Sequence, residues 1–394
     1  MSKKLAIYCD CDSDSGMLTY TLMLLTALKD YSDINTFVIT SSPRNQQEQE
    51  RLYKLQKNSA GICVLSRNYS SSKKAAQELN RILVNSGIDY YIPNYRYMPH
   101  LALSYLPRNI KNIIVVHNDT EEIYQSIRFY FSAIDGVIFP SRSAFAKSNN
   151  TIPGIVNKVC IPHYFSALGD GKPRSEKEDR LIVVYHGRLA HAQKKSMELL
   201  QIALQLNILQ VPFTLKIIGA GDALKDIQQK VKDEAIANVE LIGQLGRDQL
   251  IQELCDADIA LSTSTYEGFC YSVAESLSLG IVPVVYENEV LHDLIQNGVN
   301  GYLLPWGRAD LVALKIQELH QNPQQRLAMS NAAIKSVEPL ISAERYARQM
   351  TDFLKILDNA PVGRAWPIFR PRGLAYDTLL SRTIARFGRK LNFW

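Results

Sequence analysis

Two glutamates in the second half of the chain are the residues best placed to do chemistry. Glu267 and Glu275 have seven residues between them. The apolar run Ala257–Leu261 precedes them and is typical of a buried strand, and a helical pattern ending at Gly280 follows. A turn containing Gly268 and the start of a helix therefore lie at the carboxyl end of a strand, where open α/β sheets bind ligands. Because a helix start favours anions, we expect an anionic ligand there.

Basic residues follow an earlier strand pattern. His186-Gly187-Arg188-Leu189 ends the apolar run that begins at Leu181, and Lys194-Lys195-Ser196 opens the helix pattern after it. Cations at a strand-to-helix junction suit a diphosphate. A solvated helix start that happens to be basic is the alternative, and the downstream glutamates favour the diphosphate site.

A glycine-rich turn follows the next strand pattern. Gly219-Ala220-Gly221 comes directly after Ile217-Ile218. The turn lacks the third glycine of a dinucleotide fingerprint, which argues against NAD. It is either the border of a nucleotide site or a tight turn that simply requires glycine.

The elements that must position these residues alternate between strand and helix patterns, which predicts parallel, doubly wound sheets. Near-continuous apolar strands suit sheets covered on both faces. We expect the strands at Leu5–Asp10, Ile34–Thr40, Gly61–Leu65, Asp89–Pro93, Asn112–His117, Gly136–Phe139, Leu181–His186, Phe213–Ile218, Val239–Ile242, Ala257–Leu261 and Ile281–Val285.

The chain of 394 residues is long enough for two domains. Residues 167–179 are rich in Gly, Pro and charge and are typical of a linker. We expect a Rossmann-like domain over 1–166, a second one over 180–357 and an extension over 358–394. Two such domains facing across a cleft would create a favoured ligand site.

Composition limits the class of protein. The chain is 46% hydrophobic and 21% charged, and no apolar run approaches the roughly 18 residues of a membrane span. The N-terminus enters a strand pattern without a signal-peptide core, so we expect a cytoplasmic protein. The six cysteines lack metal-site spacing, and the net charge of +5 does not indicate nucleic acid.

These motifs together resemble those of the family-4 retaining glycosyltransferases, which have the GT-B fold and a Glu-x7-Glu motif. The segment from Gly187 to Leu200 is similar to the Gly-Arg-Leu…Lys-Gly-x-x-x-Leu pattern of that family. The stretches Leu277–Val285 and Asn297–Leu303 also resemble it. The resemblance is strong over 181–357 and weak over 1–165.

The resemblance implies roles in binding a nucleotide-diphosphate sugar, either a UDP-sugar or a GDP-sugar. Arg188 and Lys195 would hold the diphosphate, with Ser196 in place of the usual glycine and Lys194 as the alternative lysine. Glu275 would hold the ribose hydroxyls, and Glu267 would face the donor sugar. The remaining donor-binding positions are Gly16, Gly219, Gly268, Phe269, Cys270 and Tyr271.

In the first half, Gly16 resembles the flexible glycine loop near the donor, and His117 ends a strand where the family frequently has His. His117 would hydrogen-bond a sugar hydroxyl, although a strand-end His is as often structural. With Glu267, Arg188 and Lys195 it completes the expected catalytic set. We read Asp10-Cys11-Asp12 as a turn and expect no metal, because the family needs none.

The resemblance implies a retaining transfer to an acceptor hydroxyl in polysaccharide, lipopolysaccharide or glycolipid synthesis, with a glycan or lipid-linked acceptor. The alternatives are a sugar-nucleotide epimerase or a phosphorylase of the same fold, and a sugar-nucleotide-binding module without catalysis.

The extension has a distinct charge pattern. Residues 358–394 contain seven basic residues and one acidic residue. On a helix, an apolar stripe of Tyr376, Leu380, Ile384, Phe387, Leu391 and Trp394 lies opposite Arg382, Arg386 and Arg389. A basic amphipathic helix suits an anionic membrane surface, so 370–394 would hold the protein on the inner face of the cell membrane. Packing of the stripe against the first half is the alternative.

Overall fold

The chain folds into two compact α/β units, seen in a computed structural model that describes residues 2–12, 16–94, 97–152, 154, 157–169, 180–236 and 238–360. Unit 1 takes the described chain up to Ala167, the short segment Glu267–Tyr271 and the described chain from Val337 to Ala360. Unit 2 takes Leu168–Tyr266 and Ser272–Ser336.

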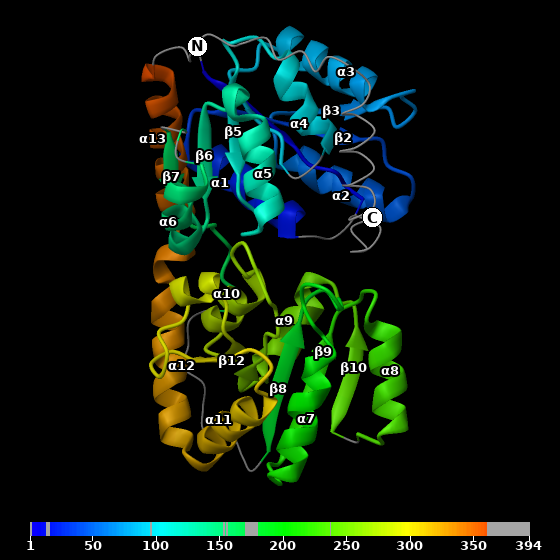
Figure 1. Cartoon of the computed structure of the whole chain (residues 1–394), viewed down its shortest axis with the longest axis vertical. Helices are drawn as coiled ribbons and strands as arrows, with labels where there is room; N and C mark the ends of the chain where they lie inside the picture. The colour runs from blue at the N-terminus through cyan, green and yellow to red at the C-terminus, as the bar shows by residue number, and fades with distance from the viewer. Residues whose placement is uncertain are drawn as a thin grey trace. The chain divides into compact units, whose positions relative to one another are not determined.

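Unit 1 is built on a seven-stranded sheet in the order β3-β2-β1-β4-β5-β6-β7, and every pair is parallel. Its apolar strands are almost wholly buried, as expected for a sheet with both faces covered. The strands, some of which are labelled in Figure 1, are β1 (Lys4–Tyr8), β2 (Asn35–Ser41), β3 (Gly61–Leu65), β4 (Tyr90–Ile92), β5 (Lys111–Val115), β6 (Gly136–Phe139) and β7 (Lys158–Cys160).

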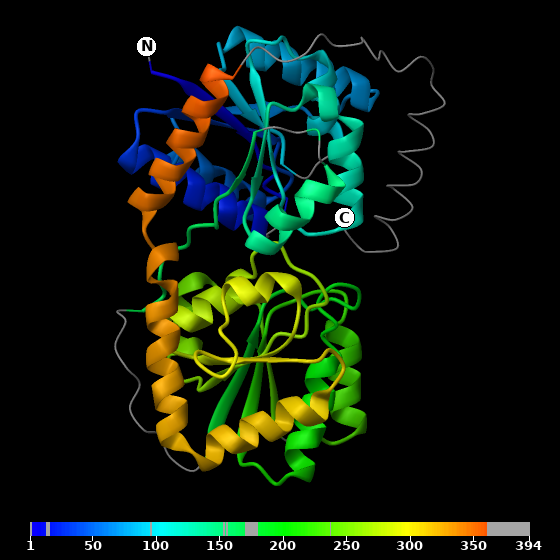
Figure 2. The same ribbon diagram turned by 60° about the vertical axis from the view of Figure 1, so that its left-hand side comes forward.

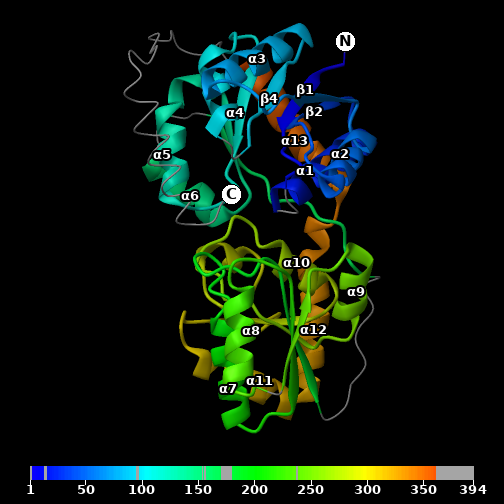
Figure 3. The same ribbon diagram turned by 90° about the vertical axis from the view of Figure 1, so that its right-hand side faces the viewer.

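Helices cover both faces of this sheet. Figure 3 shows α1 (Gly16–Tyr31), α2 (Gln46–Lys57) and α13 (Ala343–Asn359) on one side of the strands. The other side carries α3 (Ser72–Asn85), α4 (Tyr97–Ala102), α5 (Glu121–Phe129) and α6 (Arg142–Thr151). Short 3₁₀ turns lie at Leu103–Tyr105, Phe131–Ala133 and Glu338–Leu340.

The last described helix, α13, belongs to unit 1 although it follows unit 2 in the chain. It packs on α1 and buries one face, made of Tyr346, Ala347, Met350, Phe353, Leu354 and Leu357, in the unit 1 core (Figure 2). The predicted boundary of the second domain at 357 therefore differs from the structure. The reason for this difference is that the apolar face of α13, which follows Val337, packs in the core of unit 1.

Unit 2 repeats the same plan with a six-stranded parallel sheet in the order β10-β9-β8-β11-β12-β13. Its strands are β8 (Leu181–His186), β9 (Phe213–Ile218), β10 (Val239–Gly243), β11 (Ile259–Ala260), β12 (Val282–Tyr286) and β13 (Tyr302–Leu304). Its helices are α7 (Glu198–Ile208), α8 (Leu224–Asp233), α9 (Arg247–Cys255), α10 (Tyr271–Ser278), α11 (Ala309–Gln321) and α12 (Pro323–Val337), with a 3₁₀ turn at Glu289–Asp293.

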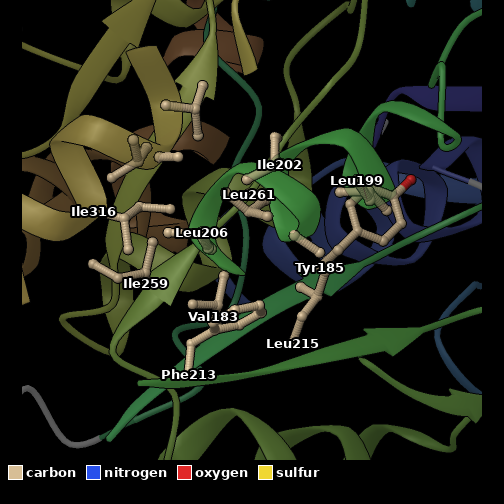
Figure 4. Packing of buried hydrophobic residues seen from close by; sticks show 14 of the residues in the cluster. Val183, Tyr185, Leu199, Ile202, Leu206, Phe213, Leu215, Ile259, Leu261 and Ile316 are labelled. Atoms are coloured by element: carbon tan, nitrogen blue, oxygen red, sulfur yellow. The ribbon is translucent and has the colours of Figure 1, made fainter. Parts of the chain in front are cut away.

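The larger core of unit 2 lies on the face covered by α7, α8 and α11. Figure 4 shows Val183, Tyr185 and Leu215 of the sheet beneath the α7 side chains Leu199, Ile202 and Leu206. A smaller cluster on the opposite face packs Leu254, Ala257 and Leu279 near α9 and α10. Both faces of the sheet are thus sealed, and polar groups can gather only at its ends.

The predicted doubly wound parallel sheets are confirmed. In each sheet the order reverses beside the first strand, between β1 and β4 in unit 1 and between β8 and β11 in unit 2. Such reversal points at the carboxyl ends of strands are the usual ligand sites of this architecture. The edge strands β7 and β13 were not predicted.

Two expected segments lie wholly or mainly outside the described residues. These are the linker, from residue 170 onward, and the extension from residue 361, which includes the predicted amphipathic stripe. Within the described ranges, none of the helices has the length and apolar character that crossing a bilayer demands.

The packing of α13 generates a stability prediction. Phe353 is 2% exposed, and its ring lies so close to Gly136 that a Cβ built there would come within 2.7 Å of it. We expect Phe353→Ala to lower the unfolding free energy of unit 1 by about 3–5 kcal/mol, the usual cost of emptying a buried aromatic site. Ile356→Ala is the matched control, because Ile356 lies on the same helix but is 55% exposed. Urea unfolding of the full chain measures both, and equal effects would contradict the assignment of α13 to this core.

Candidate functional site

The loop after β8 is held in one conformation by side-chain hydrogen bonds. The guanidinium of Arg188 donates to Oε1 of Gln193 at 2.8 Å, and Nε2 of Gln193 donates to the carbonyl of Tyr266 at 3.0 Å. The hydroxyl of Tyr185 donates to the carbonyl of Arg188 at 2.8 Å. Arg188 itself is exposed. The structure thus fixes the backbone of Arg188 and leaves its charge at the carboxyl end of the first strand of unit 2.

The backbone conformation of Lys195 bears on whether Lys194 or Lys195 corresponds to the lysine of the resembled pattern. Lys195 has φ +46°, a left-handed conformation that glycine adopts freely and L-residues adopt at a cost. The Lys-Gly pair of the resembled pattern therefore aligns with Lys194-Lys195, and Leu199 takes the place of its leucine. Under this alignment Lys194, the alternative to Lys195, would be the counterpart of the family lysine. The charge of Lys194 also contributes to the lowered pKa of the buried His186.

Close backbone packing accounts for the glycine turn after β9. A Cβ added to Gly219 would come within 1.9 Å of the Gly187 carbonyl oxygen, and one on Gly221 within 1.9 Å of that of Leu189. The amide of Leu189 donates to the carbonyl of Ala220 at 2.9 Å. Of the two interpretations of this turn, the structure supports the tight turn: its glycines let it pack directly against the loop that carries Arg188.

His186 ends β8 and is buried beneath α10. Its Nε2 lies 2.9 Å from the carbonyl oxygen of Ser272 and 3.2 Å from Oγ of Ser276. A carbonyl oxygen only accepts, so Nε2 carries the proton and Nδ1 is unprotonated. Burial, with a smaller contribution from the charge of Lys194, lowers the pKa of His186 to about 4. The imidazole is therefore neutral at physiological pH.

The carboxylate of Glu275 has few stabilising interactions with the described residues. Its side chain is 12% exposed, and no donor among the described residues is within hydrogen-bonding distance of either carboxylate oxygen. The nearest charged or titratable atoms are NH1 of Arg247 at 3.7 Å from Oε1 and Nδ1 of His186 at 3.9 Å from Oε2. Burial raises the pKa of Glu275 to about 7, against an opposing effect of Arg247.

The other glutamate, Glu267, lies in the segment that packs with unit 1. The carbonyl of Glu267 accepts from the Asp119 amide at 3.3 Å. A Cβ added to the next residue, Gly268, would come within 1.8 Å of the carbonyl oxygen of His117. We expected Gly268 to admit a ligand close to the backbone. The structure shows instead that this glycine admits the end of β5.

Aromatic rings hold the rest of this segment. The ring of Tyr271 stacks on His163, with centroids 5.8 Å apart at 11°, and Phe269 meets Tyr271 edge-on at 5.1 Å. Cys270, between them, is buried and has φ +67°. Gly16 begins α1 beside Tyr271, whose ring carbon would lie 3.9 Å from an added Cβ. The side chains of Phe269 and Tyr271 are thus used in packing.

His117 is half-buried and has a fixed orientation. Nδ2 of Asn94 donates to the carbonyl of Tyr8 at 2.6 Å, so Oδ1 of Asn94 faces Nε2 of His117 at 2.9 Å. Burial, with a smaller contribution from His100, lowers the pKa of His117 to about 3. His117 therefore stands at the carboxyl end of β5 as a neutral imidazole.

The predicted site residues fall into two groups. Unit 2 contains Arg188, Lys195, Gly219 and Glu275, and unit 1 contains Gly16, His117 and the segment Glu267–Tyr271. Sequence reasoning did not assign roles to Gln193, Arg247, His163 or His186. Only His186 carried a recognisable signal, since it ends a strand pattern as His117 does. Within the described ranges, no three His, Cys, Asp or Glu side chains are grouped as a metal ion would need.

A protein-family model matches the second half of the chain. Residues 170–336 match the model described as "Glycosyl transferases group 1". This match supports the coarser part of the expected family and covers most of unit 2.

Two curated relatives match over a similar length. The amylovoran biosynthesis glycosyltransferase AmsK of Erwinia amylovora is 27% identical over 152 residues, which are 37% of each chain. The poly(glycerol-phosphate) alpha-glucosyltransferase of Bacillus subtilis strain 168 is 29% identical over 149 residues, which are 37% of this chain and 21% of the relative. The aligned stretches thus span well under half of either relative.

Solved structures match nearly the whole chain. HepE of Anabaena, solved in complex with UDP and glucose, has a TM-score of 0.73 at 16% identity and covers 90% of this chain and 100% of its own. Sucrose-phosphate synthase of Thermosynechococcus elongatus has a TM-score of 0.71 at 16% identity, covering 91% and 100%. At this identity the likeness shows the fold, and it confirms the predicted class of two parallel-sheet α/β domains of GT-B type.

The packing of Gly268 can be tested directly. We expect Gly268→Ala to push the segment Glu267–Tyr271 off the end of β5, because the added methyl would overlap the His117 carbonyl. Hydrogen exchange at the Asp119 amide should then accelerate. Gly246→Ala is the control, since the nearest atom to its added Cβ is 3.8 Å away. Unchanged exchange at Asp119 in Gly268→Ala would show that this contact does not hold the segment.

Proposed function

We propose that this chain is a glycosyltransferase that transfers a sugar from a nucleotide-diphosphate sugar to an acceptor hydroxyl. The observation that carries the proposal is the carboxylate of Glu275, which is largely buried at the carboxyl edge of the unit 2 sheet, with no hydrogen-bond donor among the residues that the structure describes.

An unsupported buried carboxylate is costly, because burial removes water without replacing its hydrogen bonds. The cost is explained if a ligand supplies the donors. A ribose has two neighbouring hydroxyls, and a carboxylate has two oxygens that can each accept one. Such an arrangement favours a ligand with a vicinal diol, such as the ribose of a nucleotide, over an unsubstituted phosphate.

The diphosphate of the donor would meet two cations. Arg188 is held by Gln193 in the loop after β8, and Lys194 is the next residue after Gln193 in the same loop. We propose Arg188 and Lys194 as the diphosphate ligands. The start of α10 would add the positive end of a helix dipole, and no metal is obligatory in this scheme.

The proposed transfer retains configuration. The bond between the anomeric carbon and the diphosphate oxygen breaks while the acceptor oxygen bonds to the same face of that carbon. The acceptor proton passes to the leaving diphosphate. Arg188 and Lys194 would stabilise the charge that develops on the diphosphate, and Glu267 and His117 would contact sugar hydroxyls. Support for retention comes from the resembled family and from the printed name of the Bacillus subtilis relative, an alpha-glucosyltransferase.

The acceptor proposal rests on the relatives. AmsK is named for amylovoran biosynthesis and the Bacillus protein for poly(glycerol-phosphate). We therefore propose a glycan or lipid-linked acceptor in the synthesis of a surface polysaccharide. A cytoplasmic location on the inner membrane face stays a prediction that depends on residues 370–394.

The role of Glu275 predicts two opposite effects of Glu275→Gln. Without ligand, the variant should unfold at a higher temperature, because a buried charge is removed. With nucleotide, it should lose about tenfold or more in affinity, the usual scale for one charged hydrogen bond. Thermal shifts with UDP, GDP, ADP and CMP, with and without magnesium, measure both.

The exposed Glu240→Gln is the matched control and should change neither quantity. A selective shift with one diphosphate in the wild type, reduced in Glu275→Gln, would name the donor base. If no nucleotide stabilises the wild type, the donor site is wrong. A variant that is less stable and still binds fully would make Glu275 a structural residue.

The choice between the lysines gives a second prediction. Lys195→Gly should keep nucleotide affinity, because glycine is the residue that the left-handed backbone favours. Lys194→Ala should weaken diphosphate binding about tenfold and leave binding of the unphosphorylated nucleoside unchanged. Isothermal titration with both ligands makes the comparison, and the reverse pattern would restore Lys195 as the ligand.

Turnover separates the proposed transferase from its alternatives. Incubation with the selected UDP- or GDP-sugar, with and without a saccharide acceptor or inorganic phosphate, distinguishes the reactions. Product that requires the acceptor supports the transferase. Sugar isomerisation without an acceptor indicates an epimerase, phosphate-dependent product indicates a phosphorylase, and binding without turnover indicates a non-catalytic module.

A further inference from the structure

Arg247 is a charged residue of unit 2 that the proposed function has not yet used. It is the first residue of α9, directly after the glycine that caps this helix, and it follows β10 at the carboxyl edge of the sheet. Its side chain is 45% exposed, and its NH1 lies 3.7 Å from Oε1 of Glu275. α9 carries Arg247, α10 carries Glu275 and β8 carries His186. These three elements are well separated in the chain, and the fold brings the three side chains together.

The groups around Glu275 differ in charge. His186 approaches from β8, and its imidazole is neutral because burial depresses its pKa. Lys194, from the loop before α7, acts on His186. Ser272 and Ser276, on the helix of Glu275 itself, are engaged with His186. Arg247 is the cation whose charge acts on the Glu275 carboxyl group.

The distance between the two groups matters as much as their charge. At 3.7 Å the guanidinium is too far away for a hydrogen bond and near enough for a strong Coulomb interaction. The oxygens of Glu275 are therefore stabilised as a carboxylate while their lone pairs stay open. A direct, bidentate arginine would instead occupy the positions that a ligand needs.

We propose that Arg247 is a positioning residue for nucleotide binding, which holds Glu275 as an open carboxylate ready to accept both hydroxyls of a ribose. This inference rests on the proposed function and adds a residue to it. A protonated Glu275 would present one hydroxyl donor and one good acceptor, so it could not accept two ribose hydroxyls equally.

The sign of the pH dependence follows from this role. Burial raises the pKa of Glu275 to about 7, and Arg247 holds it below the value that burial alone would give. Nucleotide binding needs the carboxylate, so affinity should fall as the pH drops through about 7. Removing Arg247 should raise this pKa further and move the loss of affinity to higher pH.

The experiment is isothermal titration from pH 5.5 to 9 with UDP, GDP and the matching nucleosides uridine and guanosine. The nucleosides have no phosphate that titrates in this range. Wild type is compared with Arg247→Gln and Arg247→Lys. Arg308→Gln is the matched control, because Arg308 also begins a helix of unit 2 as an exposed arginine paired with an acid, Asp310.

We expect Arg247→Gln to bind about tenfold more weakly than wild type near neutral pH for each unit by which the pKa of Glu275 rises. The affinities should converge at pH 9, where Glu275 is ionised in both proteins. Arg247→Lys should restore most of the wild-type profile, because it keeps the charge, and Arg308→Gln should match wild type.

Two results would overturn the inference. An equal loss of affinity at every pH would mean that Arg247 contacts the nucleotide itself or only supports the fold. An unchanged profile would mean that its charge does not act on binding. If neither nucleotide nor nucleoside binds the wild type at any pH, the proposed function itself is wrong. This outcome can be distinguished from the two results above, in which the wild type binds.

Discussion

The parallel direction of the strands is the constraint on which the rest of this structure depends. Parallel strands must be joined by helices that cross the sheet, and these helices bury both faces. Polar groups then have only the ends of the strands to occupy. In unit 2 the carboxyl end of β8 provides Arg188 and His186, and the helix after β11 provides Glu275. These polar and charged side chains lie there because helices cover both faces of the sheet.

The parallel sheets and their covering helices could be predicted from the sequence because they follow from local patterns. Apolar runs of four to six residues with helical periods between them fix the strand order to a few choices. Arg188 and Glu275 were predicted from the same patterns, since Arg188 follows the run that ends at His186 and Glu275 lies in the helix after the run Ala257–Leu261. The edge strands β7 and β13 were not predicted. The packing of α13 on unit 1 was not predicted either, because the apolar stripe of a helix does not indicate which sheet the helix covers.

Backbone conformation adds information that local sequence patterns lack. Lys194 and Lys195 are identical side chains, and only the positive φ of Lys195 separates them. Gly268 and Gly219 were predicted donor-binding positions, and each lies against another stretch of backbone, at the His117 and Gly187 carbonyls. His163, buried against Tyr271, has no signal at all in the sequence. These contacts join residues that are distant in sequence, so local sequence patterns cannot predict them.

The position of α13 has a consequence for how the protein is made. Ribosomes deliver the chain from the N-terminus, and domains generally fold as they emerge. The core of unit 1 is completed by Met350, Phe353 and Leu354, which are synthesised after every strand of unit 2. The first unit to emerge is therefore the last to finish its core, and until then α1 exposes the apolar surface that α13 later covers. During this interval a nascent chain presents a binding surface for chaperones that the finished protein lacks.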